Sequence, residues 1–261
     1  MELVIDVGNS NIVFGLYEGD QLLRYWRVGS DRGKTEDEYA VLFRHLLAEG
    51  DFSFSQISGV IISSVVPPLI YPLERMGKKY LGLQPVVIGP GIRTGLNIKT
   101  ENPREVGADR IVNAVAALEL YGPPVIIVDF GTATTFCAVN EHSEYLGGAI
   151  APGIGISTEA LFQRTAQLPR VELLDPGKVI GRHTIAAMQA GIYYGFVGQV
   201  EGIVKQMIEE MQSSLPVQVV ATGGLAGLIA VHAKSIQVVN PLLTLQGLHM
   251  IYQRNLGRHH L

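Results

Sequence analysis

The chain opens with LVIDVGNSNIVFGLY, residues 3–17, in which two apolar runs are separated by a tight polar turn. The first run ends at Asp6 and Gly8 before the strand pattern resumes. A third run, residues 21–28, follows the turn Glu18-Gly19-Asp20. The opening therefore predicts three consecutive strands, with Asp6 and Gly8 in the first connection.

The same pattern returns in the second half of the chain. Residues 125–128 form an apolar run that ends in Asp129-Phe-Gly131-Thr132, and two further runs follow near 135–139 and 145–150. The two Asp-x-Gly turns lie 123 residues apart, close to half of the 261-residue chain. This spacing predicts two copies of one α/β unit, residues 1–115 and 116–261, each with a sheet covered by helices. Because Asp-x-Gly is also a common turn, coincidence is the alternative.

Composition narrows the class of protein. The net charge is −4 and no basic block occurs, which argues against binding to nucleic acid or to a membrane surface. The single cysteine, Cys137, excludes an internal disulfide framework and suits a reducing compartment. No cationic leader precedes the first strand, and no apolar run is long enough to span a bilayer. We therefore expect a cytoplasmic protein whose partners are small molecules.

Both Asp-x-Gly turns have the features of a phosphate site. Glycine lets backbone N–H groups approach an anion closely, and residues 8–11 and 131–135 place hydroxyl or amide side chains directly after the glycine. Each turn also carries a carboxylate that suits a cation, Asp6 or Asp129. We expect the two turns to bind a polyphosphate from both sides, with Gly223-Gly224 as a nucleoside contact. Ordinary hairpin turns are the alternative.

A competing phosphate site lies at residues 29–35, Gly-Ser-Asp-Arg-Gly-Lys-Thr, between a strand and a helix. Only three residues separate its glycines, where a P-loop needs four. We therefore expect Lys34 to lie in a polar loop, and Thr35 or an acidic neighbour to cap the helix that follows. The Asp-x-Gly turns contain no lysine, so Mg²⁺ and a monovalent cation are implied for charge neutralisation.

A third candidate is residues 102–110, Asn-Pro-Arg-Glu-Val-Gly-Ala-Asp-Arg. Asp109 and Arg110 fall in the first turn of a predicted helix, where the helix dipole favours the ionised carboxylate. Asp109 can then accept a proton from an attacking alcohol, and Arg110 can bind an anionic group or a phosphoryl oxygen. A helix-start aspartate beside an exposed arginine is the alternative.

A long predicted helix over residues 185–211 has an unusual face. It contains glycines at intervals of four, three and four residues, at Gly191, Gly195, Gly198 and Gly202. These positions form one stripe. Each glycine destabilises a helix interior by about 0.5–1 kcal/mol relative to alanine, so a close approach of another backbone is the natural compensation. Two explanations are open: packing against the protein's own sheet, or a partner helix in a symmetric dimer.

Four motifs together resemble the type III pantothenate kinases: DVGNSN (6–11), GADR (107–110), DFGTAT (129–134) and GGAIAPG (147–153). Their order and spacing match, and the resemblance continues through Thr184 to LTLQGL (243–248). It implies the duplicated ribonuclease-H-like halves of the actin, hexokinase and acetate-kinase superfamily. It also implies ATP-dependent phosphorylation of pantothenate to 4'-phosphopantothenate, the first step of coenzyme A biosynthesis, by a homodimer that uses Mg²⁺ and K⁺ or NH₄⁺.

The resemblance also assigns roles to residues. Asp109 is implied as the catalytic base, Asp129 as the monovalent-cation residue, and Asp6 as an indirect Mg²⁺ contact. Pantothenate is implied to bind at Gly107, Ala108, Asp109, Arg110 and, from the other subunit, Thr184. ATP is implied to bind at Asp6, Val7, Gly8, Asn9, Ser10, Asn11, Ile12, Val13 and Thr132.

One departure and two alternatives accompany this interpretation. The family commonly has a tyrosine two residues before the Asn-Pro pair, where this chain has Thr100, so the shape of the pantothenate pocket differs there. A non-catalytic nucleotide-binding regulator on the same fold is one alternative. The retained Asp6, Asp109 and Asp129 argue against it. Another kinase or phosphatase of the superfamily is the second alternative.

Overall fold

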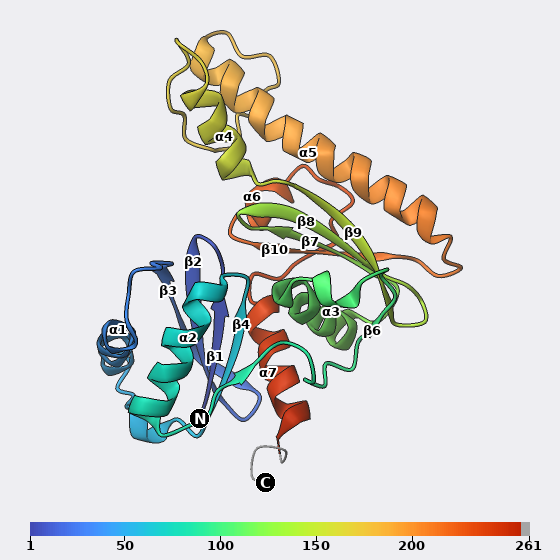
Figure 1. The fold of residues 1–261 in the computed structure, drawn as a ribbon. Helices are drawn as coiled ribbons and strands as arrows, with labels where there is room; N and C mark the ends of the chain where they lie inside the picture. The colour runs from blue at the N-terminus through green and yellow to red at the C-terminus, as the bar shows by residue number, and fades with distance from the viewer. Residues whose placement is uncertain (257–261) are drawn as a thin grey trace. The chain divides into compact units, whose positions relative to one another are not determined.

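The computed structural model describes residues 1–256 and divides the chain into two compact units (Figure 1). Unit 1 contains Met1–Gly95, Arg104–Ala116 and the chain from Thr244 onward, and unit 2 contains Leu96–Pro103 and Ala117–Leu243. The halves predicted as 1–115 and 116–261 differ from these units in two places. Residues 96–103 lie in unit 2, and the closing helix lies in unit 1.

Unit 1 is built on a five-stranded sheet in the order β3-β2-β1-β4-β5. β1 pairs antiparallel with β2 and parallel with β4, which itself pairs parallel with β5. The strands are β1 (Glu2–Val7), β2 (Asn11–Glu18), β3 (Gln21–Gly29), β4 (Gly59–Ser64) and β5 (Val86–Val87). The helices are α1 (Glu36–Ala48), α2 (Pro67–Met76), the first part of α3 (Ala108–Tyr121) and α7 (Leu243–Asn255), with short turns η1 (Phe54–Gln56), η2 (Gly77–Leu81) and η3 (Pro103–Glu105).

Different helices pack on the two faces of this sheet. Alternate residues of β1, such as Leu3 and Ile5, share an apolar core with Phe43 of α1 and Leu69 of α2. The opposite face receives α7: its Leu245 side chain lies beside Gly15 of β2, and its Tyr252 ring occupies the space beside Gly59 of β4. His249 of α7 stacks on Tyr17 with ring centroids 4.3 Å apart. This packing places the closing helix in unit 1, although it follows the last strand of unit 2 in sequence.

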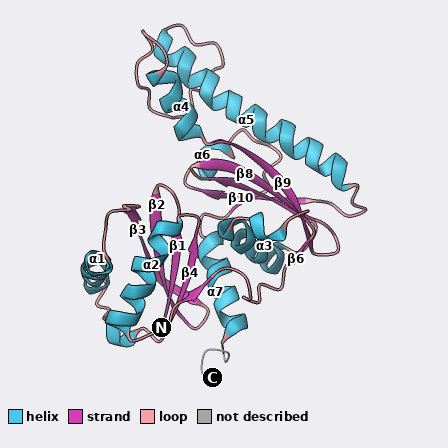
Figure 2. Cartoon of the chain, viewed as in Figure 1, coloured by secondary structure: helices cyan, strands magenta, loops and turns pink. Residues whose placement is uncertain are grey.

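Unit 2 repeats the arrangement with one strand added at an edge. Its sheet has the order β11-β10-β7-β8-β9-β6, so β7, β8, β9, β10 and β11 take the places of β1 to β5. Figure 2 shows the strands of both sheets in magenta and the helices in cyan. The strands are β6 (Asn97–Ile98), β7 (Val125–Phe130), β8 (Ala133–Val139), β9 (Glu144–Pro152), β10 (Gln218–Gly223) and β11 (Val238–Val239), and the helices are α4 (Ile154–Gln163), α5 (Thr184–Met211) and α6 (Ala226–Ile229). Tyr193, Phe196 and Val200 of α5 belong to its core.

The two units match in detail. In each, the first strand pairs antiparallel with the second and parallel with the fourth. The second and third strands slip register at equivalent points, between Leu16 and Tyr17 in unit 1 and between Ala138 and Val139 in unit 2. The expected α/β class, with two mixed sheets covered by helices, is confirmed. Within residues 1–256, no helix is both long and apolar enough to cross a membrane.

Candidate active site

The first Asp-x-Gly turn connects β1 to β2 and is held from two sides. The Gly8 N–H donates to the Asn11 carbonyl oxygen at 2.9 Å. Ser30, at the end of β3, donates its hydroxyl to the Gly8 carbonyl at 2.6 Å and its N–H to the Ser10 carbonyl at 3.0 Å. Arg32 brings a guanidinium nitrogen to 3.5 Å from the Asn9 side-chain oxygen. The turn is therefore a fixed loop with a cation beside it, and Ser30 and Arg32 were not predicted.

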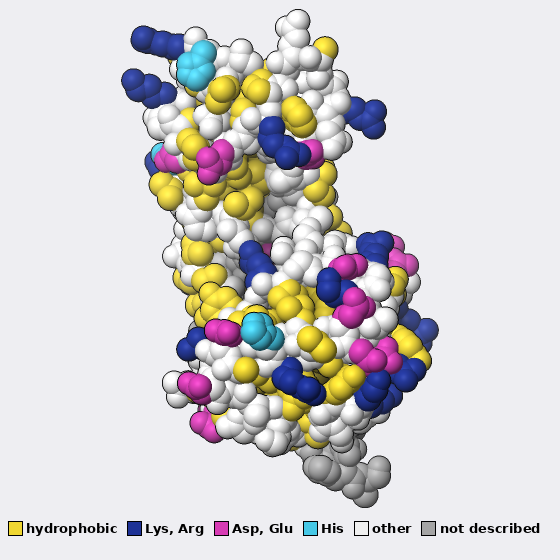
Figure 3. Space-filling view, turned by 90° about the vertical axis from the view of Figure 1, so that its left-hand side faces the viewer, with side chains coloured by type: hydrophobic (Ala, Val, Ile, Leu, Met, Phe, Trp, Pro, Cys, Tyr) yellow, Lys and Arg dark blue, Asp and Glu magenta, His cyan; other side chains and the backbone are white. Residues whose placement is uncertain are grey.

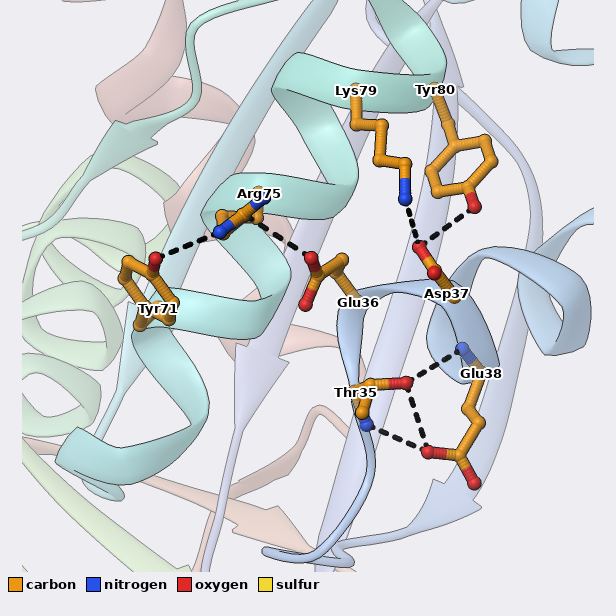
Figure 4. Close-up of polar contacts among 8 residues, drawn as sticks. All are labelled: Thr35, Glu36, Asp37, Glu38, Tyr71, Arg75, Lys79 and Tyr80. Atoms are coloured by element: carbon orange, nitrogen blue, oxygen red, sulfur yellow. Dashed lines mark hydrogen bonds and ion pairs between the residues drawn. The ribbon is translucent and has the colours of Figure 1, made fainter.

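The loop that resembled a P-loop caps a helix instead. Thr35 forms a capping box with Glu38 at the start of α1, as Figure 4 shows, which confirms the predicted cap. The next residues, Glu36 and Asp37, are also acidic and pair with Arg75 and Lys79 of the neighbouring segment (Figure 4). A phosphate would meet carboxylates at this helix N-terminus instead of open N–H groups.

Residues 107–110 lie next to the first turn within unit 1. The Val65 N–H, just after β4, donates to the Val7 carbonyl at 3.1 Å and extends the β1–β4 pairing to the edge of the turn. A Cβ on Gly107 would stand 3.8 Å from the Val65 side chain. Val65 therefore lies between the phosphate turn and the segment that carries Asp109. Val65 was not among the predicted site residues.

A side chain at position 107 would displace the Asp109 carboxylate. A Cβ there would stand only 2.6 Å from Asp109 Oδ1, closer than real side-chain atoms approach. The same oxygen accepts the Arg110 N–H at 2.8 Å, which orients the carboxylate in the first turn of α3. Asp109 and Arg110 begin the helix as predicted.

The electrostatics of Asp109 differ from the expectation. From the sequence alone, the helix dipole is expected to favour the ionised carboxylate. In the structure, burial dominates and raises the pKa of Asp109, although the Arg110 N–H and the Arg110 charge act to lower it. A raised pKa brings the carboxyl group closer to the working range of a general base.

The second turn, between β7 and β8, surrounds a small set of oxygen atoms. The Gly131 N–H donates to the Ala133 carbonyl at 3.1 Å. A Cβ on Gly223, whose φ is +89°, would stand 2.6 Å from both Asp129 Oδ1 and the Phe130 carbonyl oxygen. The space that a side chain would fill is thus lined by oxygen ligands, which fit a hard cation such as K⁺. The Asp129 position suits the predicted monovalent-cation role.

The protein offers few side-chain ligands for Mg²⁺. Among residues 1–256, no group of three or more His, Cys, Asp or Glu side chains is arranged to hold a metal. Mg²⁺ commonly keeps several waters and binds through one or two carboxylates together with substrate phosphates. Asp6, at the end of β1, is a carboxylate suited to such an indirect contact.

The other predicted residues occupy separate positions. Unit 1 holds both Asp6–Val13 and Gly107–Arg110, whereas unit 2 holds Asp129 and Thr132. Thr184 is the exposed first residue of α5. Thr100 lies in unit 2 with its methyl group 3.6 Å from a Cβ position on Gly147, and its hydroxyl is buried with no hydrogen-bond partner in the described chain.

Sequence comparison identifies the family. A family model of the type III pantothenate kinases matches residues 2–206. The chain belongs to this family. Type III pantothenate kinases from Geobacillus sp. (strain WCH70) and Brevibacillus brevis are 60% and 63% identical over 258 and 255 residues. The first alignment covers 99% of both chains, and the second covers 98% of this chain and 99% of the relative.

Solved structures of more distant proteins share the fold of this family member. A Campylobacter jejuni protein assigned to the Baf family of transcriptional activators aligns over 97% of this chain and 98% of its own, with a TM-score of 0.60 and 20% identity. A ROK family glucokinase from Streptomyces griseus, in complex with glucose and AMPPNP, aligns over 98% and 99% with a TM-score of 0.54 and 12% identity. At these identities the likeness concerns the fold alone.

Proposed function

We propose that the chain transfers the γ-phosphoryl group of ATP to the primary hydroxyl of pantothenate, giving 4'-phosphopantothenate in the first step of coenzyme A biosynthesis. The observation that carries this proposal is a link through Val65 within unit 1: its N–H pairs with Val7 beside the first Asp-x-Gly turn, and its side chain lies 3.8 Å from a Cβ built on Gly107. This link supports a base for the alcohol at the start of α3 and a cradle for the phosphates at the end of β1. Family membership supports pantothenate as the alcohol.

In this mechanism Asp109 accepts the proton of the attacking hydroxyl, because it is a half-buried carboxylate with a raised pKa. The backbone of Asp6–Val13 and the Thr132 side chain orient the phosphates. Arg110 and the backbone of Gly107 and Ala108 orient pantothenate. Mg²⁺, when bound near Asp6, neutralises phosphate charge. Positioning and charge neutralisation supply most of the catalysis in phosphoryl transfer.

A monovalent cation is proposed at Asp129. The Asp129 carboxylate and the Phe130 carbonyl oxygen flank the side-chain-free space of Gly223. K⁺ or NH₄⁺ bound there would hold the turn that contains Thr132. Asp129 then acts on the phosphates through this turn.

A homodimer is proposed along α5. The four glycines of the stripe are exposed, and among residues 1–256 nothing lies within 4 Å of a Cβ built on any of them. The stripe therefore does not pack on the protein's own sheet, and its exposure supports the alternative of a partner helix. Gly198 and Gly202 also line a groove with Leu146 and Met207.

Exposed apolar side chains also occur in α4 and around the start of α5. They include Ile180, which is 85% exposed, and Ile156, Val179 and Ile185. Figure 3 shows hydrophobic side chains gathered in the upper part of the view, at the height of α4. Exposed apolar patches of this kind mark association surfaces. Thr184 begins the same helix, which suits the proposed contact with pantothenate in the other subunit.

The test is a coupled ADP-release assay with ATP, with and without pantothenate and with K⁺ or Na⁺ as the monovalent ion. We expect ADP release that requires pantothenate and is faster with K⁺. Release without pantothenate measures background hydrolysis and is the control. Absence of pantothenate-dependent release with every cation would favour the non-catalytic regulator. The cytoplasmic location stays a prediction.

A further inference from the structure

The hydroxyl of Ser63 is buried without a hydrogen-bond partner beside the first phosphate turn. Ser63 is 0% exposed, and its Oγ has no partner among residues 1–256. A buried hydroxyl that makes no hydrogen bond is costly, and native structures keep few of them. Ser63 therefore requires an explanation that the ligand-free fold does not provide.

The strand pairing places Ser63 next to Asp6. β1 and β4 run parallel, and Asp6 pairs in register with Ser63. Paired residues of neighbouring strands project to the same face of a sheet, and the strands lie about 4.8 Å apart. This face is not the α1–α2 core, which receives the alternate residues Ile5 and Ile62. The Ser63 hydroxyl and the Asp6 carboxylate are thus neighbours on one face.

Unit 2 contains the same pair. Asp129 of β7 pairs in register with Thr222 of β10, and Thr222 is only 2% exposed. The preceding residues on these fourth strands, Ile62 and Ala221, are apolar. A buried hydroxyl therefore stands opposite the strand-end carboxylate in both copies of the fold. The repetition points to a role linked to the carboxylate.

We propose that Ser63 is a positioning residue for Asp6: its hydroxyl donates a hydrogen bond to the Asp6 carboxylate when Mg²⁺ and nucleotide are bound. This inference rests on the proposed function of the first turn. Because Ser63 is completely covered, it touches neither phosphate nor cation and acts through Asp6. One oxygen of the Asp6 carboxylate would accept the hydrogen bond from Ser63. The other oxygen would then be the one that faces the hydrated Mg²⁺.

The test is equilibrium titration of ADP with and without Mg²⁺, together with thermal unfolding of the ligand-free protein. We expect Ser63→Ala to raise the Kd of Mg·ADP about tenfold, since hydrogen bonds to charged groups are among the stronger ones. The Kd of ADP without Mg²⁺ should stay unchanged. The Tm of the ligand-free variant should equal or exceed that of the wild type, because the unpartnered hydroxyl is gone. Ser63→Thr, which keeps a hydroxyl, should restore part of the Mg²⁺ effect.

Tyr17→Phe is the matched control. Tyr17 also has a buried hydroxyl without a partner among residues 1–256, but it pairs with Glu2, at the opposite end of β1 from Asp6. This variant should leave both Kd values unchanged. Equal binding of Mg·ADP by the wild type and Ser63→Ala would overturn this inference but not the proposed function. A lower Tm for Ser63→Ala, together with ADP binding weakened equally with and without Mg²⁺, would do the same. Failure of the wild type to bind Mg·ADP would overturn the proposed function as well.

Discussion

The two Asp-x-Gly turns differ in length although the strands around them match. In unit 1 the last paired residues are Val7 and Ile12, so residues 8–11 form the turn. In unit 2 they are Phe130 and Thr134, so residues 131–133 form it. The first turn has room for two polar side chains between its hydrogen-bonded ends, and the second has room for one. The duplicated strands thus form a constant frame on which the turns have diverged.

The connections after the third strands differ more. In unit 1, β3 leads through a short loop to α1, whose first turn is acidic and capped. In unit 2, β9 leads to α4 and then to the 28-residue helix α5 with its exposed glycines. Unit 1 also contains Asp109. The proposed function thus assigns the base for the alcohol to unit 1, and the cation turn and the partner surface to unit 2.

The largest effect is expected from Asp109→Asn, which tests whether the base belongs to unit 1. General-base catalysis contributes about 10²- to 10⁴-fold, so kcat should fall by that factor. ADP binding should persist, because the phosphate turns are unchanged. Steady-state kinetics and equilibrium titration measure the two quantities. Turnover within tenfold of the wild type would show that another group accepts the proton.

Unfolding of the same variant gives an independent readout. Burial raises the pKa of Asp109 above its unfolded value of 3.8. The native state therefore binds more protons between the two pKa values, and stability from this group is full below the unfolded pKa and is lost as pH rises through the folded one. Asn cannot ionise, so Asp109→Asn should be more stable than the wild type in urea at neutral pH, with the gain vanishing in acid. A destabilised variant would contradict the burial of an ionised carboxylate.

An intermediate effect is expected from Gly198→Leu, which tests whether unit 2 carries the partner surface. Overpacking a close contact costs about 1–3 kcal/mol, so dimer association should weaken about 10- to 100-fold. Activity should fall with it, because Thr184 begins the same helix. Sedimentation velocity over a range of concentrations measures association. Gly89→Leu in unit 1 is the control, since a Cβ there also meets open space and lies outside the proposed surface. If Gly198→Leu had the same mass in solution as the wild type and a higher free energy of unfolding, the substitution would only have stabilised the helix. The stripe would then face solvent.

Much of this frame could be predicted, because it depends on local signals. Apolar periodicity predicted α5 to within one residue, and the two Asp-x-Gly turns predicted the duplication. Helix α4 was not predicted; its sequence directly follows the glycine-rich motif GGAIAPG, residues 147–153.

The remaining features depend on contacts between distant segments. The docking of α7 in unit 1 rests on Leu245 beside Gly15, a pairing that no local pattern encodes. Val65 and Ser63 acquire their places only from the register of β4 against β1. One signal was available: the apolar strand Val60-Ile-Ile62 ends abruptly in two serines. A polar end on a buried strand indicates that its last residues face a polar site.

The smallest effect is expected from Lys34→Ala, which tests whether unit 1 has a second phosphate loop that unit 2 lacks. Lys34 lies 2.9 Å from Asp31, and this hydrogen bond raises the pKa of Lys34 and keeps its ammonium group engaged in the loop. Activity should therefore stay within about threefold of the wild type, as expected for an exposed ion pair. Arg32→Ala is the matched comparison, since Arg32 reaches the Asn9 side chain. It should raise the KM for ATP more than Lys34→Ala does. The opposite order would move the phosphate contact from the Asp6 turn to the loop before α1, and the two units would then bind nucleotide by different means.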